Sequence, residues 1–174
     1  NRADANEALK PYGKKIGPDP ATITTALVGG IFNNNSSGMC CGTVENSYKT
    51  VRSMRAVLAD GTILDTGNPQ SVKEFMATHS KLIDDVLNLR SEIMADSELV
   101  DLIRRKYKIK NTTGYGINSL VDFEDIVDIL NHIFIGSEGT LGFVSEVVYN
   151  CVDDAKYKGC GSCSLLNSTM HLVP

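Results

Sequence analysis

The sequence lacks two features that would place the chain in a membrane or on nucleic acid. In its 174 residues no apolar run approaches the roughly 20 residues of a membrane helix, and the N-terminus carries no secretory signal pattern. The formal net charge of −4 gives no basic surface for nucleic acid. An apolar content of 42% and a charged content of 22% are ordinary for a globular domain. We expect one domain, or a domain and a lobe, with no transmembrane segment and no nucleic-acid partner.

Several catalytic motifs are also absent. There is no G-x-G-x-x-G after a strand, no G-x-x-x-x-G-K-[ST] and no G-x-S-x-G, which leaves Rossmann, phosphate-loop and serine-hydrolase readings unsupported. The three histidines, His79, His132 and His171, show no pairing with a nucleophile. Hydrolase and kinase interpretations are therefore unsupported.

Cysteine is scarce, and the number of cysteines is odd. The odd count of five predicts free thiols and a reducing compartment, so the N-x-[ST] sequons carry no meaning for glycosylation. The vicinal pair Cys40-Cys41 is interpreted as thiols packed beside a loop. Cys160 and Cys163 form a lone C-x-x-C, and a zinc knuckle with Cys151 and His171 lacks the expected spacing of paired ligands. We predict no metal site.

What the sequence does have is a permissive stretch from Gly17 to Tyr48, GPDPATITTALVGGIFNNNSSGMCCGTVENSY. Glycine lets a backbone or ligand approach closely, and asparagine tolerates the left-handed region. We interpret the stretch as a coil held against a nucleotide cofactor; the alternative is an ordinary surface loop. Its apolar members favour a buried position lining a site: Ile23, Ala26, Leu27, Val28, Ile31 and Phe32.

Local signals predict most of the secondary structure. Residues 1–10 are expected to end a helix at Pro11, and residues 51–65 to form a hairpin around Asp60-Gly61. Residues 68–107 are predicted to be helical, with Asn68 and Asp96 as caps, Pro69 at the first helical position and basic residues in the last turn.

The C-terminal half contains a second permissive region. Asp122 is expected to cap a short helix through Leu130, and the glycines of 136–142 to form a tight turn. A strand should follow over 143–148, with Val144 and Val147 on opposite faces, and a further strand is predicted over 164–166. Both glycine-rich regions would fit one ligand groove, and we predict that residues 33–42 and 113–116 are mobile without a ligand.

Four segments carry a family resemblance: GPDPATITTALVGG with NNNSSGMCCGTVENSY, then SMRAVLADGTILDT, then KNTTGYGINSL, and finally FIGSEGTLGFVSEV. In this order they resemble the FAD-binding domain of the vanillyl-alcohol-oxidase superfamily, the PCMH type. The nearest branch is the D-lactate/glycolate/D-2-hydroxyglutarate dehydrogenase group, and KNTTGYGIN is most similar to its large members, which also carry an iron–sulfur domain. The resemblance covers about residues 17–148.

The resemblance implies an α+β fold, a mostly antiparallel sheet flanked by helices. Residues 1–174 would be a single domain fragment, with the second, C-terminal lobe of the FAD-binding domain over about 17–152. It also implies the FAD-binding part of an oxidoreductase that oxidises a D-2-hydroxy acid such as D-lactate, glycolate or D-2-hydroxyglutarate. The first lobe, the cap domain that binds the substrate and the iron–sulfur cysteines would lie outside this chain. We therefore place no catalytic residue in this chain and expect it to be inactive alone.

The resemblance also implies the cofactor contacts. Pro18 and Asp19 would lie near the pyrophosphate or the flavin. Glu138, Gly139 and the backbone of Val144 would reach the adenine side; Glu138 can also be read as a base or as a turn cap. The remaining residues would wrap the FAD: Gly29, Gly30, Asn34, Asn35, Ser37, Gly38 and Gly42.

Two alternatives remain open at this point. The chain can be a standalone α+β binding or interaction module with structural glycine loops, or a flavin oxidase of another alcohol or a sugar. The resemblance leaves the electron acceptor undefined, and it implies a cytoplasmic parent or one held peripherally at the inner face of the membrane.

Overall fold

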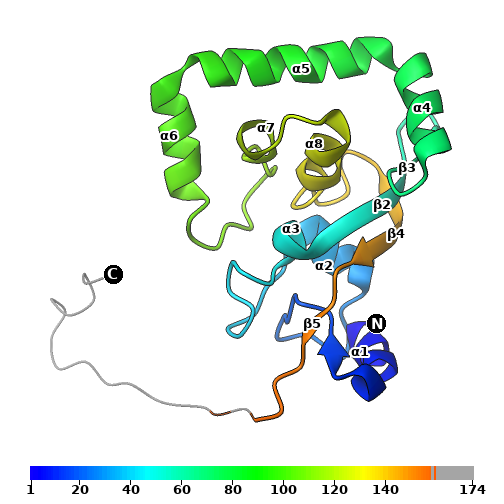
Figure 1. Ribbon diagram of the computed structural model, residues 1–174, viewed down its shortest axis with the longest axis vertical. Coiled ribbons are helices and arrows are strands. Elements are labelled where there is room, and N and C mark those ends of the chain that lie inside the picture. Colours follow the sequence, from blue (N-terminus) through cyan, green and yellow to red (C-terminus); the bar gives the residue numbers. More distant parts are fainter. Residues whose placement is uncertain (158, 160–174) are drawn as a thin grey trace, which may run out of the picture.

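A computed structural model describes residues 1–157 and 159, and it has the expected α+β architecture with small antiparallel sheets (Figure 1). The N-terminal elements are α1 (Arg2–Leu9), η1 (Lys10–Tyr12), β1 (Lys14–Lys15), α2 (Val28–Asn34), α3 (Ser47–Thr50), β2 (Val51–Val57) and β3 (Ile63–Asp65). They are followed by α4 (Pro69–Thr78), α5 (Ser80–Ala95), α6 (Ser97–Lys106), α7 (Ser119–Asp122), α8 (Ile126–Ile133), β4 (Phe143–Tyr149) and β5 (Val152–Asp153). In the described part of the chain, no helix combines the length and apolarity needed to cross a membrane.

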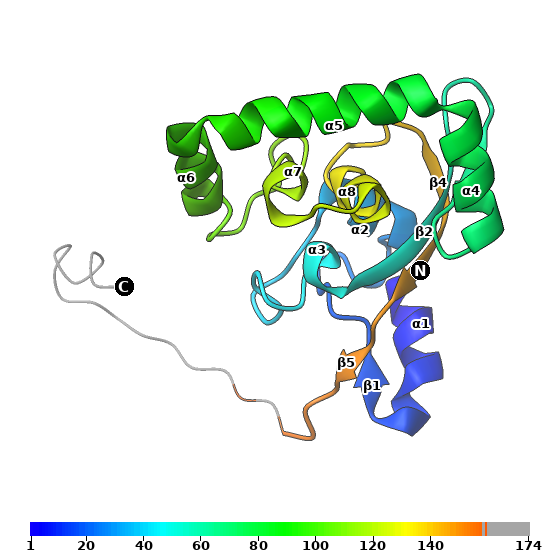
Figure 2. The same cartoon turned by 45° about the horizontal axis from the view of Figure 1, so that its top comes forward.

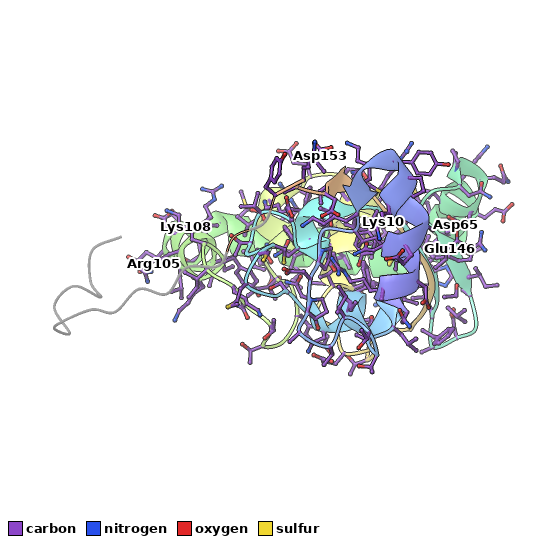
Figure 3. The ribbon with its side chains drawn as sticks, turned by 90° about the horizontal axis from the view of Figure 1, so that it is seen from below. Lys10, Asp65, Arg105, Lys108, Glu146 and Asp153 are labelled. Carbon is purple, nitrogen blue, oxygen red and sulfur yellow. The ribbon has the colours of Figure 1, made fainter. Side chains whose placement is uncertain are left out.

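The larger sheet has three antiparallel strands in the order β3-β2-β4. Its hairpin is the one predicted, with Arg55 opposite Asp65 and Gly61 at a φ of +86° in the turn. Arg55 lies between two carboxylates, 2.8 Å from Asp65 and 3.1 Å from Glu146. Figure 3 labels Asp65 and Glu146, which lie near each other on the edge of the molecule. The smaller sheet pairs β1 with β5 and ties the two ends of the described chain together.

The predicted alternation along β4 is wrong. Arg55 pairs with Glu146 and Ala56 with Val144, so Ser145 is an extra residue that the pairing register with β2 skips. Such a bulge moves the following side chains to the other face. Val144 and Val147 consequently pack in the same core cluster rather than on opposite faces.

The core has three clusters that follow the architecture. The first joins α2 to β2 and β4 through Phe32, Met54, Ala56 and Val144. The other two anchor the helical arm α4–α6: the second contains Leu64, Phe75, Ile83, Ile126 and Leu130, and the third Val100, Ile103 and Val121. Figures 1 and 2 show the three helices of this arm forming a frame around α7 and α8.

The caps predicted for this arm are confirmed. The Asn68 side chain accepts from the amides of Gln70 and Ser71, Pro69 is the first helical residue, and Asp96 accepts from the amide of Leu99. The cap predicted for the next helix is wrong. Asp125, not Asp122, accepts from the first amides of α8, because Asp122 lies at the end of α7 and binds Tyr48 and Asn118 instead.

The expectation of a coil through the first glycine-rich stretch is also wrong at its centre. Residues 28–34 form α2 despite two glycines and two asparagines. Ile31 and Phe32 are buried against the sheet, and this tertiary burial outweighs the poor helix propensity of their neighbours. Asn35 ends the helix in the left-handed conformation, with a φ of +51°.

Candidate functional site

The structure joins the two glycine-rich regions at the C-terminal end of α2. The amide group of Asn34 donates to the Glu138 carboxylate over 2.6 Å. Two backbone bonds run alongside it, from the Glu138 amide to the Asn33 carbonyl at 2.9 Å and from the Gly136 amide to the Phe32 carbonyl at 3.4 Å. Residues far apart in the sequence therefore form one surface, as the shared-groove hypothesis requires.

The Glu138 turn has unusual backbone geometry. Glu138 has a φ of +53° and Gly139 one of +78°, a region that costs a residue with a side chain about 1–2 kcal/mol. The Glu138 carboxylate is engaged by Asn34, which favours its role as a turn-forming residue over that of a base. Gly139 has no atom within 4 Å of the position a Cβ would take, so its backbone is open to a close contact.

Asp19 organises the loop that follows α2. Its carboxylate accepts from the amides of Gly38, Cys40 and Cys41 at 2.8, 3.1 and 3.2 Å. Burial by itself would raise the pKa of Asp19, but the hydrogen bonds from Cys41, Gly38 and Cys40 outweigh it, and the pKa is lowered. Asp19 is thus ionised and acts on any ligand through the shape of this loop.

The remaining predicted contacts fall into two kinds. Pro18 is fully buried, Gly38 leaves only 2.0 Å between a Cβ and the Asp19 carbonyl, and Gly29 packs toward the carbonyl of Val144. These residues hold the backbone in place. Gly30 and Gly42, like Gly139, have no atom within 4 Å of a Cβ position, so they present open backbone to a ligand.

The cysteine interpretation is half confirmed. Cys41 is buried, whereas Cys40 and Cys151 are exposed, and all three are free thiols. Cys160, Cys163, His171 and the strand predicted over 164–166 lie outside the described residues. Within residues 1–157 and 159, no cluster of histidine, cysteine and carboxylate side chains could hold a metal ion.

A cavity of about 440 Å³ opens beside this surface. Its walls come from the end of α2, from α3 and the loop before it, from α6, and from residues 107–118. Of the residues predicted to bind FAD, only Asn35 lines it. The sequence interpretation assigned no cofactor contact to the residues of the other walls, although its second permissive region includes Gly114 and Gly116, which line the cavity.

Aromatic side chains and a carboxylate form one wall of the cavity. Burial raises the pKa of Tyr48, and its 2.8 Å hydrogen bond to Asp122 raises it further. Behind it, burial lowers the pKa of His132, and the ring stacks on Phe123 with centroids 4.1 Å apart. We expect Tyr48 to be a protonated donor and His132 a neutral packing residue near pH 7.

Four buried side-chain oxygens have no partner among the described residues, and two of them belong to Asn35 and Asn118, which line the cavity. Asn35 Oδ1, Ser37 Oγ, Asn118 Oδ1 and Ser119 Oγ are buried and have no hydrogen bond among the described residues. An unsatisfied buried polar group costs about 1–3 kcal/mol. Two of the four, Asn35 and Ser37, belong to the predicted cofactor contacts. Unpaired oxygens beside open glycine backbone fit the hydroxyl and N–H groups of a flavin nucleotide.

Comparison with known proteins identifies the class. Residues 1–67 match a protein family described as FAD binding domain, and this range contains all the predicted contacts between Pro18 and Gly42. The residues over 138–144 lie outside the matched range.

Relatives of this chain carry a more particular name. Over 160 residues it is 27% identical to the D-2-hydroxyglutarate dehydrogenase of Haemophilus influenzae, which covers 88% of the chain and 15% of the relative. The enzymes of the same name from Escherichia coli and Pantoea ananatis are 29% identical over 142 residues and 30% identical over 148, each covering 81% of the chain and 14% of the relative. Residues 1–67 therefore belong to an FAD binding domain, and over most of its length the chain is similar to these dehydrogenases, of which it spans about 15%.

Proposed function

We propose that this chain supplies the second lobe of an FAD site in an oxidoreductase that oxidises a D-2-hydroxy acid. One observation carries the proposal: the hydrogen bond between Asn34 and Glu138 joins the two segments that the family resemblance assigns to the cofactor. The names of the relatives support D-2-hydroxyglutarate as the substrate of the parent, with D-lactate and glycolate as the other members of the class.

The roles of the residues follow from their surroundings. Gly30, Gly42 and Gly139 would let the backbone approach the nucleotide. Asn35 and Ser37 would give their unpaired oxygens to its donor groups. The other predicted residues would keep these atoms in place: Pro18, Asp19, Gly29, Asn34, Gly38, Glu138 and Val144.

FAD, when bound, accepts the hydride, and the chain contributes placement and electrostatics. The substrate would be held by a cap domain elsewhere in the parent protein, where the electron acceptor and any iron–sulfur cluster would also belong. The proposed parent is cytoplasmic or bound peripherally at the inner face of the membrane, which fractionation of cells expressing it would decide.

A flavin fluorescence titration tests the proposal, first with this chain and then with the full-length parent. An isolated lobe has to order its loops with few compensating contacts, so the chain should bind FAD weakly or not at all and the parent tightly. If neither quenches the flavin signal, the assignment is wrong and the glycine segments belong to a structural binding module. Tight binding by the chain alone would contradict the division of the site into two lobes.

A further inference from the structure

A second cavity, of about 200 Å³, lies where the helical arm meets α8 and the hairpin. Every side chain that lines it is apolar. Leu64 and Phe75 belong to the second core cluster and Phe134 to the first, while Leu58 packs against both clusters. The second cavity is therefore a seam between two parts of the core, in the region where α4 and α5 frame α8 (Figure 2).

Two hydrogen bonds hold α5 in place beside the second cavity. At the start of the helix, the His79 ring donates to the Asp60 carboxylate of the hairpin turn over 2.9 Å. Further along, Arg90 Nε donates to the carbonyl of Phe123 over 2.8 Å. The Phe75 ring, which lines the second cavity, stacks on His79 with centroids 4.4 Å apart. The helix cannot settle into the space without breaking one of these contacts.

Neither water nor neighbouring side chains fill this space well. Protein interiors pack to the density of organic crystals and contain few voids larger than a water molecule. A buried water molecule needs roughly two to four polar partners, and the side chains that line the second cavity offer none. An apolar ligand, by contrast, gains contacts with all of the walls and loses no hydrogen bond.

The size and position of the second cavity define the ligand further. An apolar cavity of about 150 Å³ holds benzene, so a volume of about 200 Å³ accommodates one aromatic ring with a short alkyl substituent. Leu82 lines the space and is 41% exposed, which lets a ligand enter beside α5. We propose that the second cavity binds an uncharged, apolar small molecule with a single aromatic ring or a branched alkyl group of the same size.

This ligand also reaches the turn that carries two predicted FAD contacts. Phe134 and Leu141 line the second cavity, and Glu138 and Gly139 lie between them in the sequence. A ligand packed against both side chains stabilises the turn in the conformation that the structure shows. It thereby acts as an effector of the cofactor site, a consequence that rests on the function proposed above.

Toluene and phenol are matched probes, because they have nearly the same size and differ in a methyl and a hydroxyl group. In thermal melts of the 174-residue chain, toluene should raise Tm with increasing concentration, since a ligand that binds only the folded state stabilises it. A compound that merely coats exposed apolar groups also binds the unfolded chain and does not raise Tm. In isothermal titration calorimetry, phenol should bind about tenfold more weakly than toluene, because its hydroxyl is buried without a partner.

Two leucines on α5 provide matched variants. Leu82→Trp places a larger ring at the second cavity, whereas Leu89→Trp makes the same change at an exposed residue that does not line it. The natural chain has no tryptophan, so the fluorescence of each variant reports a single ring. Leu82→Trp should show the blue-shifted emission of a buried indole and no toluene binding. Leu89→Trp should show the emission of an exposed indole and bind toluene as the wild type does.

Val86→Phe fills the second cavity from the same helix and should also remove toluene binding. The proposal is overturned if toluene does not raise Tm, if phenol binds as well as toluene, or if Leu82→Trp and Val86→Phe both bind toluene like the wild type. Toluene binding by the chain but not by the full-length parent assigns the space to a side chain of the parent, which overturns it as well.

Hydrogen exchange measured by mass spectrometry tests the effect on the turn. Toluene should slow amide exchange at residues 136–142 and leave α1 unchanged. Toluene binding with unchanged exchange at these residues overturns its role as an effector. None of these measurements involves FAD, so their failure leaves the proposed function standing.

Discussion

The side-chain amide of Asn34 and the carboxylate of Glu138 lie 2.6 Å apart and close the junction between two segments separated by 104 residues. Glu138 makes this bond from a left-handed conformation, with a φ of +53°. Natural chains retain such strain where a specific geometry is needed. Variants at this junction can therefore separate the contribution of the turn to the stability of the fold from its contribution to cofactor binding.

Glu138→Gly should change stability little and cofactor binding more. Glycine relieves about 1 kcal/mol of backbone strain, which offsets the loss of one exposed hydrogen bond worth about 1 kcal/mol. The free energy of unfolding in urea should stay within about 0.5 kcal/mol of the wild type, whereas the FAD affinity of the parent should fall. Glu138→Ala, which loses the bond and keeps the strain, is the control and should be less stable than Glu138→Gly. Equal stability of the two variants would argue against strain at this residue.

We expect substitution of alanine for Gly30 and for Gly38 to change the stability of the fold in opposite directions. Gly30 lies in α2 with no atom within 4 Å of a Cβ position, so Gly30→Ala should stabilise the fold by about 1 kcal/mol through helix propensity. Gly38→Ala would place a Cβ 2.0 Å from the Asp19 carbonyl and should cost about 3 kcal/mol or more. Thermal melts of the two variants check both signs.

The same Gly30→Ala variant also tests the predicted cofactor contact. If a nucleotide lies against Gly30, the added methyl group should weaken FAD binding by the parent while the fold becomes more stable. A variant that is more stable and binds FAD with unchanged affinity would remove Gly30 from the site.

Local chemistry explains which parts of the fold were predictable. The hairpin at Asp60-Gly61 and the caps at Asn68 and Asp96 depend on neighbouring residues alone, and each was found where the sequence placed it. Helix α2 was missed because its stability comes from burying Ile31 and Phe32 against the sheet, which no local signal expresses.

The site was predictable to the extent that motifs marked it. The family resemblance assigned Asn34 and Glu138 to different parts of one cofactor, and the structure joins the two side chains by a hydrogen bond. The cavity was missed because Lys49 and Arg104 are ordinary surface residues of different helices in the sequence. They become neighbours of one cavity only because α6 packs on α7, and α7 is bonded to α3 through Asp122 and Tyr48.

Asp19 should make the free energy of unfolding fall as the pH is lowered through the acid range. A carboxylate whose pKa is lowered in the fold stabilises it fully above its ordinary value of 3.8, and that contribution is lost as the pH falls through the lower folded value. Asp19→Asn should therefore reduce the free energy of unfolding at pH 7 by about 2 kcal/mol and flatten its decline below about pH 4. Urea unfolding over this pH range is the measurement.

The control for this experiment is Asp84→Asn, an exposed carboxylate on α5 with no hydrogen bond in the described chain. It should leave both the stability at pH 7 and the slope in acid unchanged. If Asp19→Asn behaves in the same way, the three amide bonds to Asp19 do not hold the loop in solution.

Tyr48 and Tyr149 should keep their protons at alkaline pH as long as the fold persists. Burial raises the pKa of both, and for Tyr149 it reaches about 12. Because the fold favours the protonated phenol, the stabilisation is complete below the ordinary tyrosine pKa of 10 and is lost as the pH rises through the pKa of the folded state.

In an absorbance titration of the six tyrosines, Tyr48→Phe should leave the signal below about pH 11 unchanged and remove a step that appears only at higher pH or on unfolding. Tyr149→Phe is the matched variant, since its hydroxyl bonds Ser47 rather than a carboxylate, and it should remove the step near pH 12. Loss of signal below about pH 11 in Tyr48→Phe would mean that the Tyr48–Asp122 bond, and with it this wall of the cavity, is open in solution.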